Sequence, residues 1–172
     1  MPDLSSNIMI RKSADVSECG RYRWWLRRSW GQGHRVVTFV MLNPSTADHE
    51  IDDPTIRRSI RFAQDWGFDV LSVRNLFALR ATNPQELLTA NCPTGGSRGD
   101  RELALAATAQ LVVAAWGAFV PFDREREALS LLRNCQLHHL GLTKHGRPRH
   151  PLYVPASTQP TEWCVESVRT NP

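Results

Sequence analysis

Three polar residues, Asn43, Asn75 and His150, stand where predicted strands end or in a rigid loop, and their types suit chemistry on a planar ring. An asparagine amide offers a donor and an acceptor, which can match the paired acceptor and donor on the edge of a pyrimidine. A neutral imidazole can donate a hydrogen bond to an oxygen that gains negative charge during a reaction. These residues favour a site that acts on a nucleotide base.

Acidic residues close to Asn43 add a means of holding water. Asp48, Asp52 and Asp53 follow it in the sequence, and a carboxylate can orient water or bind Mg²⁺. Asp53 precedes Pro54 at the start of a helical pattern, which is typical of an N-cap, so Asp48 is the better candidate for the water-holding role. Asn43 also has a structural alternative, because asparagine often caps the turn that ends a strand.

Apolar strands must position these side chains. Residues 36–42 are apolar and β-branched without alternation, which is typical of a strand buried on both faces, and residues 69–77 and 110–116 are similar. Between them the sequence predicts helices at residues 54–66, from about 84, at 101–109 and at 121–134. The alternation predicts an α/β fold in three layers, with a mostly parallel central sheet and helices on both sides. In such folds ligands bind at the carboxyl ends of the strands.

Smaller elements are predicted at both ends of the chain. Residues 20–30 followed by Gly31 and Gly33 predict a strand and a turn, and hence an N-terminal antiparallel hairpin at a sheet edge. Short strands are predicted at residues 138–142 and 152–154. The 172 residues predict a single domain, residues 1–172, with its core at about residues 20–155.

Composition narrows the class of protein. No apolar stretch is long enough to span a membrane and no signal peptide is evident, so we expect a cytoplasmic protein. A net charge of +4 and a pI of about 9.2 favour a nucleic-acid or nucleotide partner. The four cysteines form no C-x-x-C pair, and phosphate-loop, dinucleotide and serine-hydrolase motifs are absent, so neither metal nor cofactor is expected. Nothing in the sequence specifies an oligomeric state.

Four segments resemble the domain of unknown function 1643 family, over about residues 21–155. No activity is assigned to that family. The segments are MLNPSTADHEIDDPTIRRSIRFAQDWGF, VRNLFALRATNPQEL, VVAAWG and GLTKHGRPRHPLYVP.

The order of these motifs is also similar, more distantly, to the uracil-DNA glycosylase superfamily. That resemblance implies a uracil-DNA-glycosylase-like fold, a water positioned by Asn43 in MLNPS and a flipped pyrimidine bound by Asn75. His150 in RHPLY would stabilise the leaving base, with Leu152 or Arg149 near the position that plugs the strand. The expected catalytic residues are Asn43, Asp48 and His150, and the expected substrate-binding residues are Pro44, Ser45, Asn75, Phe77, Trp116 and Arg149.

The resemblance implies an enzyme that hydrolyses the N-glycosidic bond of a flipped base, modified or not. Two alternatives remain open from the residues alone. One is a non-catalytic module that binds a nucleotide or a modified base. The other is a hydrolase or transferase of a free nucleotide, in which Asp48, Asp52 and Asp53 would bind a metal ion.

Overall fold

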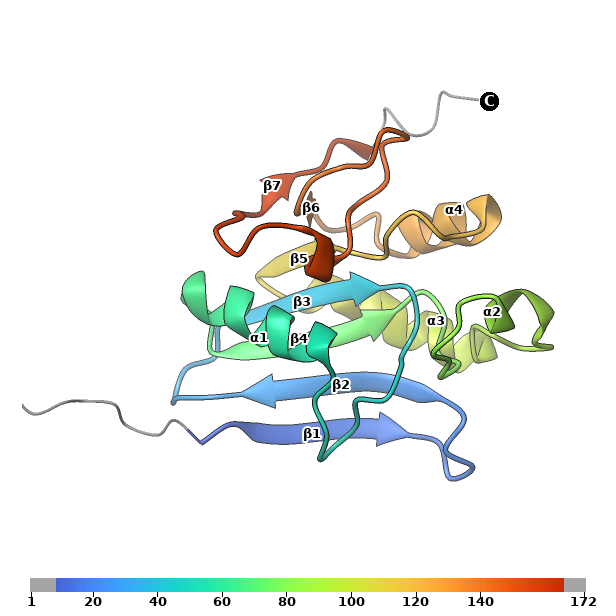
Figure 1. Cartoon of the computed structure of the whole chain (residues 1–172), viewed down its shortest axis with the longest axis horizontal. Helices are drawn as coiled ribbons and strands as arrows, with labels where there is room; N and C mark the ends of the chain where they lie inside the picture. Colours follow the sequence, from blue (N-terminus) through green and yellow to red (C-terminus); the bar gives the residue numbers. More distant parts are fainter. Residues whose placement is uncertain (1–8, 166–172) are drawn as a thin grey trace, which may run out of the picture.

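A seven-stranded mixed sheet forms the centre of the molecule in the computed structural model, which describes residues 9–165 (Figure 1). Its strands are β1 (Arg11–Val16), β2 (Arg23–Ser29), β3 (Val36–Met41), β4 (Val70–Asn75), β5 (Leu111–Ala114), β6 (Leu137–His139) and β7 (Thr161–Glu162). They lie in the order β1-β2-β4-β3-β5-β6-β7. The four strands β4, β3, β5 and β6 are parallel, whereas β1, β2 and β7 pair antiparallel at the two sides.

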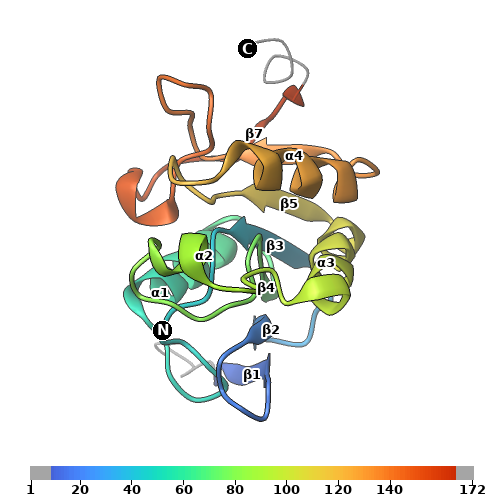
Figure 2. The same ribbon diagram turned by 90° about the vertical axis from the view of Figure 1, so that its right-hand side faces the viewer.

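Helices cover both faces of this sheet (Figures 1 and 2). Alternate residues of β3 point to opposite faces, so Phe39 packs in the cluster that includes Ile60 of α1 (Pro54–Asp65). Val40 packs on the other side with Leu103 of α3 (Gly96–Ala104) and Leu129 of α4 (Phe122–Leu131). The shorter helical elements are α2 (Glu86–Thr89), η1 (Leu105–Thr108) and η2 (Pro151–Tyr153). The predicted α/β architecture with buried central strands is confirmed.

The start of α1 follows from two residues. Asp53 accepts a hydrogen bond from the backbone N–H of Ile56 at 2.9 Å, and Pro54 occupies the first turn, where its missing N–H costs nothing. The predicted helix and its cap are therefore confirmed. Among residues 9–165, no helix combines the length and the apolar character that crossing a bilayer requires.

The strand pairing predicted for the N-terminal hairpin at the sheet edge was wrong. The hairpin consists of β1 and β2, and β2 then pairs with β4 rather than with β3. Gly31 and Gly33 belong to the connection that carries the chain past β4 to β3. β1 is mostly polar and lies at an exposed edge, so it lacks the apolar pattern on which strand prediction depends. The sheet is therefore parallel only in its central strands.

Several helix and strand boundaries in the second half of the chain also differ from the prediction. Residues 152–154 belong to a 3₁₀ turn and its end rather than to a strand, because the His150 side chain and Pro151 start a helical turn there. The short strand β7, which pairs with β6, was not predicted. α3 begins at Gly96, five residues before the predicted start.

Candidate functional site

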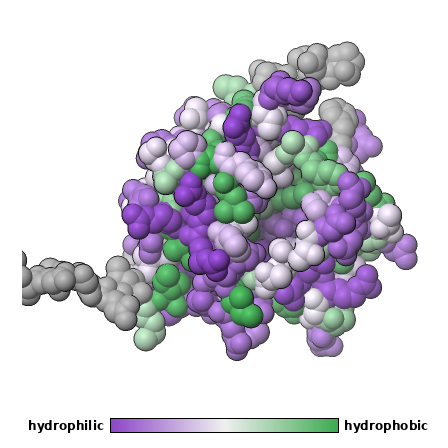
Figure 3. Space-filling model, in the orientation of Figure 1, coloured by the Kyte–Doolittle hydropathy of each residue, from purple (hydrophilic) through white to green (hydrophobic). Residues whose placement is uncertain are grey.

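A pocket lies at the carboxyl ends of the central strands, with a cavity volume of about 340 Å³. That volume falls within the ~300–1,000 Å³ that small-molecule sites commonly have. Asn43, Asn75 and His150 all line the pocket, although they are far apart in the sequence. Figure 3 shows a hollow with hydrophobic residues around it near the place where β3 and β4 end in Figure 1.

Asn43 presents an acceptor to this pocket. Its Nδ2 donates to the carbonyl oxygens of Pro44 at 2.9 Å and Ala81 at 2.8 Å, which uses both amide hydrogens. Its Oδ1 has no partner within residues 9–165. The structural alternative and the functional prediction are therefore compatible: the amide nitrogen fixes the loop, and the oxygen remains available to orient a water molecule.

Asn75 ends β4 and presents a donor. Its Oδ1 accepts a hydrogen bond from Nη2 of Arg23 at 3.2 Å, and the Arg23 Nη1 donates to the carbonyl of Ala47 at 2.9 Å. The Asn75 Nδ2 has no partner in the described part of the chain. The expectation that this amide offers both a donor and an acceptor to a base thus needs correction, because Arg23 already occupies the acceptor.

His150 presents an N–H donor. Its Nδ1 accepts from the backbone N–H of Leu152 at 3.3 Å, so the neutral ring carries its proton on Nε2. Burial lowers the pKa of His150 below its ordinary value near 6.5, and the negative charge of Asp53 opposes part of that shift. The imidazole is therefore neutral at pH 7, with Nε2–H free of any partner among residues 9–165.

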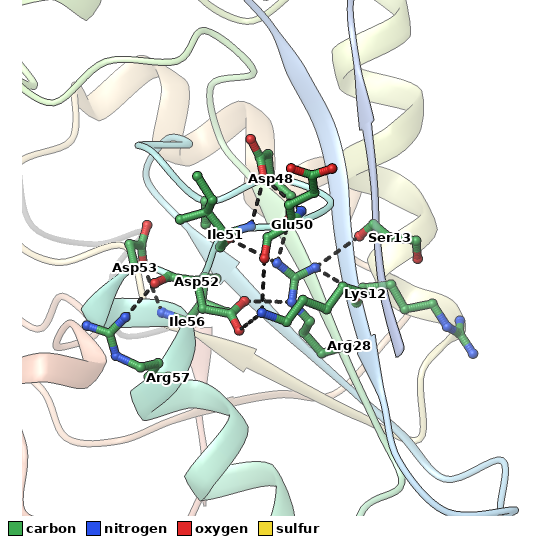
Figure 4. Close-up of polar contacts among 12 residues, drawn as sticks. Lys12, Ser13, Arg28, Asp48, Glu50, Ile51, Asp52, Asp53, Ile56 and Arg57 are labelled. Atoms are coloured by element: carbon green, nitrogen blue, oxygen red, sulfur yellow. Dashed lines mark hydrogen bonds and ion pairs between the residues drawn. The ribbon is translucent and has the colours of Figure 1, made fainter. Parts of the chain in front are cut away.

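Asp48 does not occupy the pocket, contrary to the role predicted for it. Its Oδ1 accepts from the backbone N–H groups of Glu50 at 2.8 Å and Ile51 at 2.9 Å, which closes a turn (Figure 4). These two hydrogen bonds lower the pKa of the Asp48 carboxyl. The side chain stabilises the loop rather than a water in the site.

The carboxylate that does line the pocket is Asp53. One oxygen caps α1 through Ile56, and the other has no partner within the described residues. Its charge acts on both His150 and Arg23, raising the pKa of each against the effect of burial. Asp53 was predicted mainly as a helix cap, with metal binding as an alternative. The cap leaves its second oxygen available to the pocket.

We expect Asp53→Asn to lower the rate of any reaction catalysed in this pocket by about 100-fold, because the variant lacks the negative charge beside His150 and Arg23. Asparagine caps helices as well as aspartate does, so the change removes the charge and keeps the start of α1. The rate of Asp48→Asn should stay within about twofold of the native rate, because asparagine retains an acceptor for the turn and Asp48 is not among the described residues that line the pocket. Steady-state kinetics of both variants test this assignment; equal losses in the two would contradict it.

Arg28 holds the loop that leads to Asp53. Its side chain is fully buried, and Nε donates to Oδ1 of Asp52 at 2.7 Å (Figure 4). The guanidinium also donates to the carbonyl oxygens of Asp48 and Ile51. Lys12 makes a second ion pair with Asp52 at 2.7 Å. The hairpin β1–β2 thus fixes the segment between β3 and α1.

Aromatic residues form part of the wall. Trp116 lines the pocket and donates from Nε1 to Oε1 of the buried Glu125 at 2.9 Å. Glu125 also pairs with Arg147 at 3.3 Å, and Arg147 donates to the carbonyl of Ala118 at 2.7 Å. One buried carboxylate therefore joins the loop after β5 to the segment that leads to His150.

The remaining predicted residues divide into two groups. Ser45 lines the pocket, whereas Pro44, Phe77 and Arg149 are not among the described residues that do. Phe77 is buried beneath the guanidinium of Arg124, and Arg149 is exposed with Nε donating to the carbonyl of Leu142. Other described residues line the pocket without having been predicted for it, among them Arg23, Thr55, Thr82, Phe119 and Tyr153.

Comparison with known proteins adds a family. A family model described as a protein of unknown function (DUF1643) matches residues 23–152, which include β2 to β6 and every pocket residue except Tyr153. No curated protein and no solved structure matches the chain.

Proposed function

The chain belongs to the DUF1643 family of proteins of unknown function, and we propose that it hydrolyses the N-glycosidic bond of a base flipped out of a nucleic acid. The proposal includes a fold related to that of the uracil-DNA glycosylases, whose motif order the sequence resembles. One observation carries it: an acceptor on Asn43, a carboxylate on Asp53 and a neutral N–H on His150 line the same base-sized cavity.

The roles of these groups follow from where charge develops. As the bond from C1′ of the sugar to the base breaks, its electron pair moves onto the base, and His150 Nε2–H donates to the oxygen that becomes negative. The carboxylate of Asp53 stabilises the positive charge at C1′. Water oriented by Asn43 Oδ1 attacks C1′, and the proton that it loses passes to the anionic base, which leaves a hydroxyl on the sugar and a neutral free base. Trp116 and the apolar wall exclude bulk water.

Activity should fall in acid because of His150. Its pKa lies below the ordinary value near 6.5, so the ring protonates only at lower pH. Protonation would place a hydrogen on Nδ1, opposite the N–H of Leu152, and disturb the turn that positions the ring. We expect kcat/KM to be constant near pH 7 and to decline as the pH falls through the lowered pKa.

The pH–rate profile of His150→Gln is the control for this prediction. Glutamine keeps an N–H donor but does not titrate, so the variant should be slower and should lack that acidic decline. The folded protein disfavours the protonated ring, so thermal stability should also decline below about pH 6.5, and by less in the variant, in which His139 still has a pKa lowered by burial. An identical acidic decline in the variant would exclude His150 as its cause.

Incubation with single- and double-stranded oligonucleotides that carry uracil, hypoxanthine or hypermodified pyrimidines tests the proposed reaction. Abasic sites, detected by alkaline cleavage, are expected with at least one substrate. No abasic product across the panel from a folded protein would reject the proposal.

A metal-dependent reaction on a free nucleotide finds less support. Asp48 closes a turn, Asp52 pairs with Arg28 and Lys12, and Asp53 caps α1, so the three carboxylates do not converge. Among residues 9–165, no three His, Cys, Asp or Glu side chains are placed to hold a metal ion together.

A further inference from the structure

A buried arginine stands behind the asparagine that faces the pocket. Arg23 is only 2% exposed, and its Nη2 lies 3.2 Å from Oδ1 of Asn75. Its Nη1 donates to the Ala47 carbonyl, while its Nε is buried without a hydrogen-bond partner in the described chain. Burial lowers the pKa of Arg23 to about 10, so the side chain still carries its charge at pH 7.

This arrangement fixes which end of the Asn75 amide faces a ligand. A side-chain amide can usually rotate by 180° at little cost, because its oxygen and its NH₂ group are similar in shape. Here that rotation would place the NH₂ group of Asn75 against the buried Arg23 guanidinium, which can only donate hydrogen bonds. The oxygen therefore stays on Arg23, and the NH₂ group is left for the pocket.

A second donor reinforces the selection. His150 carries its proton on Nε2, so Asn75 and His150 both offer hydrogen-bond donors to the pocket. Arg23 adds no acceptor, because a guanidinium can only donate. A ligand edge with an exocyclic amine facing Asn75 would oppose donor to donor and leave both groups unpaired. A carbonyl oxygen at the same position would accept a hydrogen bond.

We propose that Arg23 is a specificity-determining residue: by holding Asn75 Oδ1 it makes the pocket select bases with a carbonyl oxygen on the bound edge over bases with an amine there. The inference rests on the proposed function only in taking the ligand to be a base. It concerns the relative binding affinities for different bases at equilibrium and does not require catalysis.

Calorimetric titration with two nucleoside pairs tests the selection. Uridine and cytidine differ at C4, which carries an oxygen or an amine, and at the adjacent N3, which carries a hydrogen only in uridine. Inosine and adenosine differ in the same way at C6 and N1. We expect the native protein to bind the oxo member of at least one pair about tenfold or more tightly, as one donor–donor mismatch in a buried site implies.

Two variants separate selection from a structural role. Arg23→Met frees the Asn75 amide, so the preference should shrink to about twofold or less. Asn75→Asp presents only acceptors and gives Arg23 a counter-charge, so the preference should reverse by about tenfold toward the amine. If Arg23→Met does not fold, Asn75→Asp still tests the inference. Asn83→Asp is the matched control, since Asn83 is exposed, lies outside the pocket and uses its Oδ1 in a turn.

The outcomes distinguish the inference from the proposed function. Equal binding within both pairs, preference for the amine, no binding, or an unchanged preference in Asn75→Asp would each overturn the role of Arg23. Selective binding without base release from any oligonucleotide would support the inference and reject the hydrolase. Base release without selection would reject the inference alone.

Discussion

Asn43→Ala is expected to lower the rate of base release by about 100-fold or more, the typical effect of losing one group that acts only in the transition state. The change removes the Oδ1 that would orient the attacking water. It also removes the Nδ2 bonds to Pro44 and Ala81, so a stability loss of about 1–2 kcal/mol should accompany it. Single-turnover kinetics with saturating enzyme measure the chemical step without the binding step.

Thr46→Ala is the matched control for that experiment. Thr46 lies in the same loop after β3, but its side chain is exposed and it is not among the described residues that line the pocket. Its rate should remain within about threefold of the native rate, as expected for a change away from the reacting atoms. A similar loss in both variants would show that the loop as a whole, and not the Asn43 oxygen, matters.

Arg28→Met is expected to lower the free energy of unfolding by about 3–5 kcal/mol, since it breaks a buried ion pair and leaves carbonyl groups unpaired. The guanidinium is fully buried between the β1–β2 hairpin and the loop of Asp48, Ile51 and Asp52. Urea denaturation followed by tryptophan fluorescence gives the free energy directly. The melting temperature should fall by roughly 6–20 °C for a chain of this size.

Arg27→Met supplies the comparison, because Arg27 is the neighbouring residue on β2 and its side chain is exposed. It should change stability by no more than about 0.5 kcal/mol. A loss in Arg28→Met as small as that in Arg27→Met would contradict the view that Arg28 anchors the loop before Asp53.

The central fold and the convergence of three side chains could be predicted from local patterns. The apolar β3 and β4 end at residues 41 and 75, and parallel pairing aligns Met41 with Asn75. That register places Asn43 and Asn75 at the same edge of the sheet. The helix α1 was equally clear, since its cap and first-turn proline are adjacent in the sequence.

The details that failed depend on contacts between distant residues. β1 is polar, and its pairing with β2 is not visible in either segment alone. The sequence identifies Asp53 as a cap, but it does not show that Asp48 closes a turn or that Asp53 also lines the pocket. Which end of the Asn75 amide faces the pocket depends on Arg23, which lies 52 positions away in the sequence.

Base release in water enriched in ¹⁸O tests the central claim most directly. Hydrolysis at C1′ predicts one ¹⁸O atom in the sugar of the abasic product and none in the released base, by mass spectrometry of both products. The abasic product is reduced with borohydride as it forms, because its open-chain aldehyde would otherwise exchange oxygen with the solvent. Label in the base, unlabelled sugar, or no released base at all would contradict attack by a water held in this pocket.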